Sequence, residues 1–301
     1  MEETDQMPER NKILITGSSG MLGIDLCQEL AEDCEIIGTD LLTSHTSRVT
    51  SFFKSDITNR EAIAKIIALV KPDVVIHTAA MTDVDGCESA GEKAYKINAE
   101  GAGNVAGACR SAGAVLIHIS TDFIFDGKKR APYTEEDKPS PLSVYGDSKL
   151  KGEEAIKKEA EEYFILRTSW LYGKHGKNFV DTIIAKAKTE KVLKVVDGQV
   201  GSPTYTVDLA KAIHTLLDKV TGYGTYHVSN SGSVSWYGYA KEILRLSGSK
   251  TEVIAISSKE LDRPAERPAM SILDNSKFAG FTGYKLRDWK DALKEYLPGD
   301  Q

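Results

Sequence analysis

Short apolar runs alternate with longer stretches of helical periodicity through the first 170 residues. Parallel strands that are buried on both faces have nearly continuous apolar sequences, and strands that alternate with helices are typical of a doubly wound sheet. We therefore predict an α/β fold with a parallel sheet. Its expected strands are residues 13–16, 35–39, 51–54, 74–79, 115–120 and 164–169.

The pattern changes after residue 170, where stretches rich in Gly, Ser and Pro separate the apolar segments. Residues 207–219 and 235–246 have helical periodicity, and residues 224–228 have the composition of a strand. We predict a smaller mixed α/β domain over residues 171–301, with a segment near 200–230 that returns to the main sheet.

Two local signals concern the predicted helices. Thr58 and Glu61 fit a capping box, which would begin a helix at that point. The charged stretch 153–162 mixes both signs at helical spacing, which is typical of a solvent-exposed helix face. We expect its charged side chains to lie in water.

The charge balance and the cysteine and histidine patterns exclude several classes of protein. The chain has 301 residues and a formal net charge of −6, whereas proteins that coat nucleic acids or membrane surfaces normally carry a basic field. Its four cysteines and six histidines form no Cys-x-x-Cys pair and no close cluster, so no disulfide framework or metal site is indicated. Because no leader-like or membrane-spanning apolar run is evident, we expect a cytoplasmic protein.

A glycine-rich turn stands between the first predicted strand and the first predicted helix. Gly17 follows the strand, and Gly20 and Gly23 stand at the start of the helix. Glycine here lets a diphosphate approach backbone N–H groups at a helix N-terminus, where the dipole favours negative charge. We interpret residues 11–170 as a dinucleotide-binding domain. A tight turn without a ligand is the alternative.

Two aspartates stand at the ends of the next predicted strands. Asp40 follows the glycine turn by about twenty residues, where a carboxylate can accept hydrogen bonds from an adenosine ribose. Because it would repel a 2′-phosphate, Asp40 favours NADH over NADPH. Asp56 follows the short third strand, and we assign it to the adenine. A turn-forming role is the alternative for Asp40.

A tyrosine and a lysine four residues apart form the predicted reducing site. Tyr145 and Lys149 share a helical face, and Thr121 precedes them at a strand end. Ketone reduction needs a proton for the developing alkoxide, which the phenol can give. A second Tyr-x-x-x-Lys pair, Tyr237 and Lys241, lacks these neighbours, and we predict that it is not a catalytic site. A half-buried tyrosine beside a surface lysine is the alternative at the first pair.

The spacing also predicts how Lys149 acts. Bringing a phenol from its ordinary pKa of about 10 close to neutrality takes about 4 kcal/mol. A cation at about 4 Å, in an effective dielectric of about 20, contributes a similar amount. We therefore expect Lys149 to lower the pKa of Tyr145, and Thr121 to hydrogen-bond the substrate carbonyl.

Further motifs carry a resemblance to a known family. The chain is similar to the extended short-chain dehydrogenases/reductases, and it most closely resembles the dTDP-4-dehydrorhamnose reductase family. The resemblance covers nearly the whole chain and rests on residues 79–85, 120–127, 145–149, 167–170, 178–179, 201–204 and 267–268. It implies a Rossmann-type sheet, a nucleotide-sugar substrate and, as usual in the family, NADPH.

The resemblance also implies residue roles, with Thr121, Tyr145 and Lys149 as the catalytic residues. An indole such as Trp170 suits the apolar side of a 6-deoxyhexose, and the Arg267 guanidinium suits a diphosphate. A core tryptophan and a surface arginine are the alternatives. The implied cofactor-binding residues are Gly17, Gly20, Met21, Leu22, Gly23, Asp40, Asp56, Ile57, Ala79, Ala80, Thr82, Tyr145 and Lys149. The implied substrate-binding residues are Thr82, Val84, Thr121, Tyr145, Trp170 and Arg267.

The implied reaction is reduction of the 4-keto group of dTDP-4-dehydro-6-deoxy-L-mannose to dTDP-L-rhamnose by NADH or NADPH. Related dehydratases carry Thr-Asp-Glu at the strand end, and Phe123 in the third place argues against dehydration. Two hypotheses stay open: a reductase of another nucleotide-linked 4-ketosugar, and a non-catalytic regulatory subunit of methionine adenosyltransferase. A homodimer is one expected assembly, and no nucleic-acid or membrane partner is expected.

Overall fold

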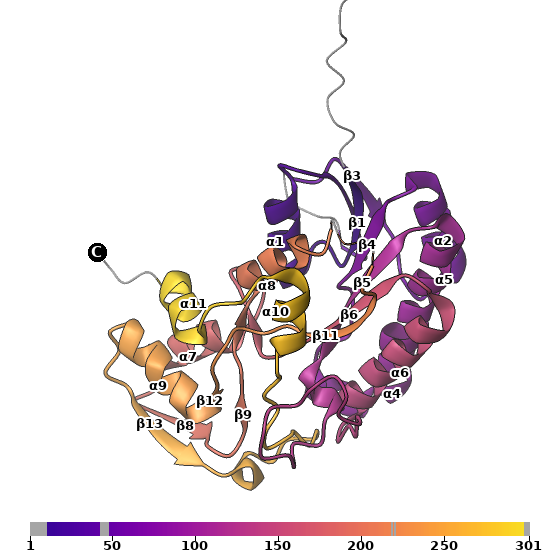
Figure 1. The fold of residues 1–301 in the computed structure, drawn as a ribbon. Helices are drawn as coiled ribbons and strands as arrows, with labels where there is room; N and C mark the ends of the chain where they lie inside the picture. Colours follow the sequence, from indigo (N-terminus) through magenta and orange to yellow (C-terminus); the bar gives the residue numbers. More distant parts are fainter. Residues whose placement is uncertain (1–10, 43–47, 218, 220, 298–301) are drawn as a thin grey trace, which may run out of the picture.

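A seven-stranded parallel sheet forms the centre of the computed structural model, which describes residues 11–42, 48–217, 219 and 221–297 (Figure 1). The strand order is β11-β6-β5-β4-β1-β2-β3, and every neighbouring pair is parallel. Because the order runs outward in both directions from β1 and β4, the predicted doubly wound fold is confirmed. The strands are β1 (Lys12–Thr16), β2 (Glu35–Asp40), β3 (Ser51–Lys54), β4 (Val74–His77), β5 (Val115–Thr121), β6 (Tyr163–Thr168) and β11 (Gly224–His227).

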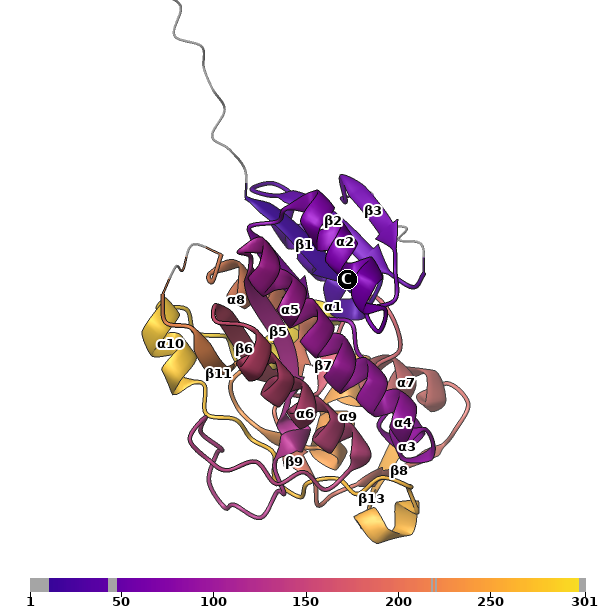
Figure 2. The same cartoon turned by 90° about the vertical axis from the view of Figure 1, so that its right-hand side faces the viewer.

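Helices cover both faces of this sheet (Figures 1 and 2). Successive strand residues point to opposite faces. Ile13 and Ile15 therefore pack in the core that includes α1 (Met21–Leu30), α8 (Thr206–His214) and α10 (Ser276–Thr282). Leu14 packs in the opposite core with α2 (Arg60–Val70), α5 (Ala102–Ala112) and α6 (Val144–Glu159).

Short elements between β4 and α5 lead into this second helical layer. They are α3 (Val84–Ser89), α4 (Gly91–Tyr95) and a π-helical segment, η1 (Lys96–Gly101), which continues directly into α5. A single 3-10 turn, η2 (Asp122–Ile124), follows β5. Both irregular segments contribute to the site described below.

The remaining elements form a smaller lobe with its own aromatic core, seen at the lower left of Figure 1. The core contains Tyr172, Tyr205, Tyr239, Trp289 and Tyr296. Three two-stranded sheets contribute: β7 (Leu171–Tyr172) with β10 (Thr204–Tyr205), β9 (Val200–Gly201) with β12 (Val234–Ser235), and β8 (Val192–Val196) with β13 (Glu252–Ile256). The helical elements are α7 (Phe179–Ala187), α9 (Trp236–Leu246), η3 (Ser258–Leu261) and α11 (Trp289–Tyr296).

The helix predicted over 207–219 is shorter than expected. It is α8, which ends at His214, and residue 218 lies outside the described residues. The segment expected to return to the main sheet is β11, which pairs with β6.

Asn59, and not Thr58, caps α2. The Asn59 side chain accepts a hydrogen bond from the Ala62 N–H at 3.0 Å, whereas the Thr58 N–H donates to Asp56 at 2.8 Å. The predicted capping box was therefore wrong, because the Asp56 turn moves the helix start one residue along the chain.

Glu153 also differs from its prediction. It is 0 % exposed and accepts hydrogen bonds from Ser120 Oγ at 2.6 Å and from Arg167 Nε at 2.9 Å and Nη2 at 2.7 Å. The next residue, Glu154, lies at the surface as expected. The solvent-exposed assignment fails at Glu153 because α6 packs on β5 and β6, which present a serine and an arginine to it.

Candidate active site

The glycine turn joins β1 to α1 at the carboxyl edge of the sheet. Gly17 has a φ of +73°, and a Cβ there would lie 2.7 Å from both the Ala79 nitrogen and Thr78 Oγ1. A Cβ at Gly23 would overlap the Gly17 carbonyl oxygen. Gly20 precedes α1 without a side-chain cap, and no acidic residue occupies the first turn. The first N–H groups of α1, beginning at Met21, can therefore receive an anion. Leu22 is buried, so it offers its backbone.

Asp40 lies against this turn at the end of β2. Its Oδ2 accepts a hydrogen bond from the Ser19 N–H at 3.0 Å, and its Oδ1 accepts one from the Leu41 N–H at 2.7 Å. These bonds hold the carboxylate beside the glycine turn, which is the placement expected for a ribose ligand. Asp56 is exposed at the end of β3, and the neighbouring Ile57 side chain is buried against Gly101.

The loop after β4 forms the opposite side of this edge. Ala79 and Ala80 are half-buried, and Thr82 is exposed. Asn98, in the π-helical segment, accepts a hydrogen bond from the Met81 N–H at 2.8 Å and donates to the Met81 carbonyl at 3.1 Å. It also donates to Ser148 Oγ at 3.0 Å, which links the loop to α6. Asn98 could not be predicted from the sequence, since a single asparagine inside a helical pattern carries no spacing signal.

Tyr145 and Thr121 meet beside the 3-10 turn that follows β5. Ser143 caps α6 and places Tyr145 in its first turn, and the Thr121 side chain hydrogen-bonds the phenol. The Tyr145 ring packs edge-on against Phe123, with ring centroids 5.7 Å apart. A Cβ at Gly146 would overlap the Phe123 carbonyl oxygen, so glycine lets α6 approach this turn. The structure thus brings Thr121 and Tyr145 together, as predicted.

The protonation of Tyr145 differs from the expectation. Burial raises the pKa of Tyr145 well above its ordinary value, the Thr121 hydrogen bond acts in the opposite sense, and the charges of Asp122 and Cys87 raise it further. The predicted lowering by Lys149 is therefore wrong for this structure. Burial dominates, and the ammonium makes its hydrogen bonds to other groups. The phenol is protonated at neutral pH, which is the form that can donate a proton.

Lys149 lies one helical turn after Tyr145 and is 3 % exposed. Its Nζ donates to the Ile119 carbonyl at 2.7 Å and contacts His118 Nε2 at 3.3 Å. Burial lowers the pKa of Lys149 to about 8, and the charge of Glu153 acts in the opposite sense. The alternative of a surface lysine is excluded by its burial.

Asp122 is a buried acid in this site that received no role from the sequence. Its Oδ1 accepts a hydrogen bond from Thr121 Oγ1 at 3.2 Å. Burial raises the pKa of Asp122 to about 7, while hydrogen bonds from Ser271 and Thr121 act in the opposite sense. Its place inside the Ser-Thr-Asp motif was the signal that could have identified it.

Trp170 stands between the main sheet and the smaller lobe, with a φ of +48°. Its ring stacks on Trp236 with centroids 3.5 Å apart and planes 5° apart. A Cβ at Gly201 would lie 2.5 Å from Trp170 Cε2, so glycine is needed there. Trp236 and Gly201 both lie against the indole, and its direct role toward a sugar stays a prediction.

Arg267 forms an ion pair that ties the C-terminal segment to the start of α3, where Val84 lies half-buried. Its Nη1 and Nη2 donate to the two oxygens of Asp85 at 3.0 Å and 2.8 Å. The hydrogen bonds from Arg267 hold the pKa of Asp85 below its ordinary value. A guanidinium held in this way keeps few free N–H groups, and its contact with a diphosphate stays a prediction.

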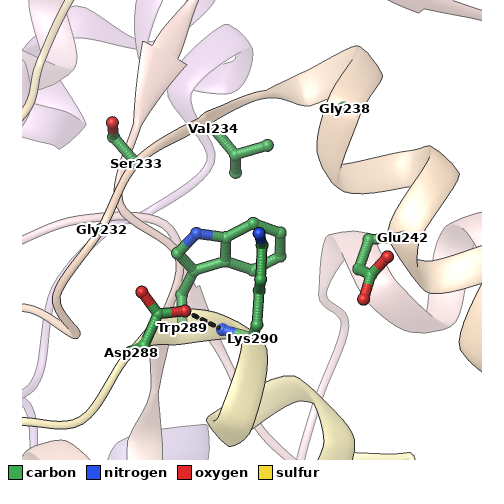
Figure 3. Close-up of a pocket in the computed structure, with 8 residues that line it drawn as sticks. All are labelled: Gly232, Ser233, Val234, Gly238, Glu242, Asp288, Trp289 and Lys290. Atoms are coloured by element: carbon green, nitrogen blue, oxygen red, sulfur yellow. Dashed lines mark hydrogen bonds between the residues drawn. The ribbon is translucent and has the colours of Figure 1, made fainter.

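A surface hollow of about 410 Å³ lies elsewhere, at the starts of α9 and α11 (Figure 3). Glu242, Asp288 and Lys290 give it mixed charge, and none of the predicted site residues lines it. The second Tyr-x-x-x-Lys pair also lies in this lobe, where Lys241 Nζ lies over the Tyr237 ring at 5.3 Å from its centroid. The carboxyl edge of the main sheet is therefore the candidate site.

The described residues contain no group of three or more His, Cys, Asp or Glu side chains arranged to hold a metal ion. Within the same residues, no helix has both the length and the apolar character that a membrane crossing needs.

Comparisons with known proteins agree with this geometry. The family model described as the RmlD substrate binding domain matches residues 11–300. The chain is 39 % identical to the spore coat polysaccharide biosynthesis protein SpsK of Bacillus subtilis, over 95 % of this chain and 96 % of the relative.

Two solved structures are similar over nearly their whole length. The dTDP-4-dehydrorhamnose reductase of Clostridium acetobutylicum has a TM-score of 0.88 and 44 % identity, covering 95 % of this chain and 98 % of the other. The Bacillus anthracis dTDP-4-dehydrorhamnose reductase in complex with NADP has a TM-score of 0.89 and 39 % identity, covering 96 % and 99 %. With a family match of this extent over the described fold, the chain belongs to the RmlD substrate binding domain family.

Proposed function

We propose that this protein reduces the 4-keto group of dTDP-4-dehydro-6-deoxy-L-mannose to dTDP-L-rhamnose, with NADH or NADPH as reductant. The observation that carries the proposal is the grouping of Thr121, Tyr145 and Lys149 on the sheet edge that also bears the glycine turn. Relatives named dTDP-4-dehydrorhamnose reductase support the substrate, and a relative in complex with NADP supports the cofactor class.

The nicotinamide group, when bound, supplies a hydride to the carbonyl carbon. Tyr145 donates its phenolic proton to the carbonyl oxygen, so the ketone gains one hydride and one proton and becomes a secondary alcohol. Burial keeps the phenol protonated until that step. We assign Thr121, which hydrogen-bonds the phenol, to the same carbonyl oxygen. Lys149 offers a buried cation close by.

A side chain at Gly17 would clash with Ala79 and Thr78, so glycine keeps this turn tight, and the uncapped N-terminus of α1 supports a site for the cofactor diphosphate. We assign its diphosphate to the N-terminus of α1 and its adenosine ribose to Asp40. The smaller lobe is assigned to the nucleotide sugar, with residues 171–301 as mainly the substrate-binding domain. Pairing of two subunits stays a prediction.

The first experiment follows reduced-cofactor absorbance with the dTDP-linked 4-ketosugar, and with its GDP- and UDP-linked counterparts. Oxidation that depends on the dTDP sugar is expected. Equal rates with all three nucleotides would remove the dTDP assignment. No oxidation with any of them, together with tight binding to a methionine adenosyltransferase, would support the regulatory alternative.

The second experiment tests Tyr145 against a matched tyrosine. Tyr145→Phe should lower kcat by about 10²–10⁴-fold, the usual contribution of a positioned acid, and leave cofactor binding largely intact. Tyr237→Phe removes the hydroxyl of the other Tyr-x-x-x-Lys pair and should leave kcat unchanged. Near-normal turnover in Tyr145→Phe would contradict the assigned proton donor.

A further inference from the structure

A row of buried polar side chains crosses the sheet from β1 to α6. Thr16, His77 and His118 occupy neighbouring positions in the register of β1, β4 and β5. Thr16 Oγ1 and His77 Nδ1 are 2.6 Å apart, and the two imidazole centroids are 5.0 Å apart. His118 Nε2 then lies 3.3 Å from Lys149 Nζ. Every member is at most 3 % exposed, so the row ends on a predicted catalytic residue in the protein interior.

The protonation state of His118 follows from this burial. Burial and the charge of Lys149 lower the pKa of His77 to about 3 and the pKa of His118 well below its ordinary value. A neutral imidazole has one N–H and one acceptor nitrogen. Because the ammonium donates to Nε2, the hydrogen of His118 lies on Nδ1, which is buried and has no hydrogen-bond partner among the described residues. The contact with Lys149 is thus the polar contact that orients this ring.

An ammonium has three N–H groups. In Lys149, the Ile119 carbonyl and His118 Nε2 account for two of them. Both acceptors belong to β5, two and three residues before Thr121. The strand that carries Thr121 therefore also fixes the direction of the Lys149 head group, and one N–H remains for a ligand.

We propose that His118 is a positioning residue, which holds the Lys149 ammonium in its charged form and directs its third N–H toward the bound cofactor. The proposal rests on the proposed reductase function for its kinetic consequence, and its binding consequence can be measured without a sugar substrate.

Charged and titratable groups from three elements bear on Lys149. Glu153 on α6 favours the ammonium, and burial disfavours it. His77 and His118, on β4 and β5, are neutral, so neither places a positive charge beside the ammonium. The charge of Asp122, which directly follows β5, acts on Tyr145 of α6. Removing the His118 acceptor therefore takes away stabilisation of the charged form only.

The Lys149 pKa of about 8 lies below its ordinary 10.5, so the ammonium is lost as pH rises through about 8. A hydrogen bond to a charged group corresponds to roughly one pKa unit or more. Without the His118 acceptor, the alkaline limb of kcat/KM should move about one pH unit toward acid. The affinity for the cofactor should likewise begin to weaken at a lower pH than in the wild type.

Three variants test the proposal. His118→Met removes the acceptor nitrogen and replaces the imidazole with an apolar side chain of similar bulk. His118→Gln restores an acceptor oxygen, since a carboxamide can accept from an ammonium. His227→Met is the matched control, because His227 is also a fully buried histidine on the sheet, but its ring contacts the Tyr133 carbonyl at 2.9 Å and Arg167 Nη1 at 3.4 Å instead of Lys149. Each variant is compared with the full-length wild type for folding by far-UV circular dichroism.

Two quantities are measured from pH 6 to pH 9, a range that extends roughly one to two units to either side of the Lys149 pKa. The first is the dissociation constant of the reduced nicotinamide cofactor, followed by fluorescence. The second is kcat/KM for the ketosugar. The acid-ward shift is expected in His118→Met, with recovery in His118→Gln and no shift in His227→Met. A pH dependence in His118→Met identical to the wild type would overturn the proposal. So would an equal shift in the His227→Met control. If the wild type binds cofactor but reduces no sugar, the proposed function is wrong, and the pH dependence of cofactor binding alone then tests the role of His118.

Discussion

Glu153→Gln is the substitution for which the structure gives the clearest energetic expectation. The change keeps the size and most of the hydrogen-bonding capacity of the side chain, and it removes the charge. Arg167 is 2 % exposed and donates two hydrogen bonds to Glu153. The variant therefore leaves a buried guanidinium beside a neutral amide.

Breaking a buried ion pair by removing one partner costs about 3–5 kcal/mol, because the remaining charge is not compensated. The adjacent Glu154 provides a matched control. Its pair with Lys151 has an N–O distance of 2.8 Å, but both side chains are about half exposed, at 54 % and 49 %. Exposed pairs contribute about 0–1 kcal/mol, so Glu154→Gln should change stability little.

Equilibrium urea unfolding, followed by far-UV circular dichroism at pH 7, measures both variants. A loss of about 3–5 kcal/mol is expected for Glu153→Gln, without a change of slope against urea. A loss no larger than that of Glu154→Gln would refute the reasoning.

The same pair predicts a pH dependence. Burial raises the pKa of Glu153, but the hydrogen bonds and charge of Arg167 outweigh it, and the folded-state pKa lies below the ordinary 4.5. A group with a depressed pKa contributes stability that is present above its unfolded-state pKa and is lost as pH falls through its folded-state pKa. The stability difference between wild type and Glu153→Gln should therefore be full above pH 4.5 and shrink below it.

Two further substitutions test the ligand assignments. Gly201→Ala places a Cβ 2.5 Å from Trp170 Cε2 and 2.7 Å from its Nε1. Overpacking of this kind costs about 1–3 kcal/mol, so the indole ring should move. The KM for the sugar should then rise about tenfold, with the KM for the cofactor unchanged. An unaltered KM for the sugar would argue against a substrate role for Trp170. Asp40→Asn keeps the side-chain shape and removes the charge that opposes a 2′-phosphate. The ratio of kcat/KM with NADPH to that with NADH should rise about tenfold, an effect of about 1.4 kcal/mol, and a constant ratio would show that Asp40 does not select the cofactor.

Local sequence was sufficient for the main sheet and for the centre of the site. The apolar runs marked the strands because parallel strands buried on both faces require them. The glycine positions marked the turn because Gly17 needs a positive φ and a close approach to Ala79. The spacing of Tyr145 and Lys149 marked one helical face, since residues four apart on a helix are neighbours.

Contacts between distant segments decided the electrostatics of the site. Glu153 looked like its charged neighbours, and only its packing against Ser120 and Arg167 made it a buried charge. The expected effect of Lys149 on Tyr145 assumed a partly solvated pair, whereas both groups take their pKa values mainly from burial.

The sequence by itself determined which segments become strands and which residues can do the chemistry, because both depend on residue type and short-range spacing. Tertiary structure alone decided which polar side chains are enclosed together. His77 and His118 come from different strands, and Asp85 and Arg267 lie 182 residues apart. The physical reason is that the free energy of a charge depends on the dielectric and the partners around it, which exist only once the elements have packed.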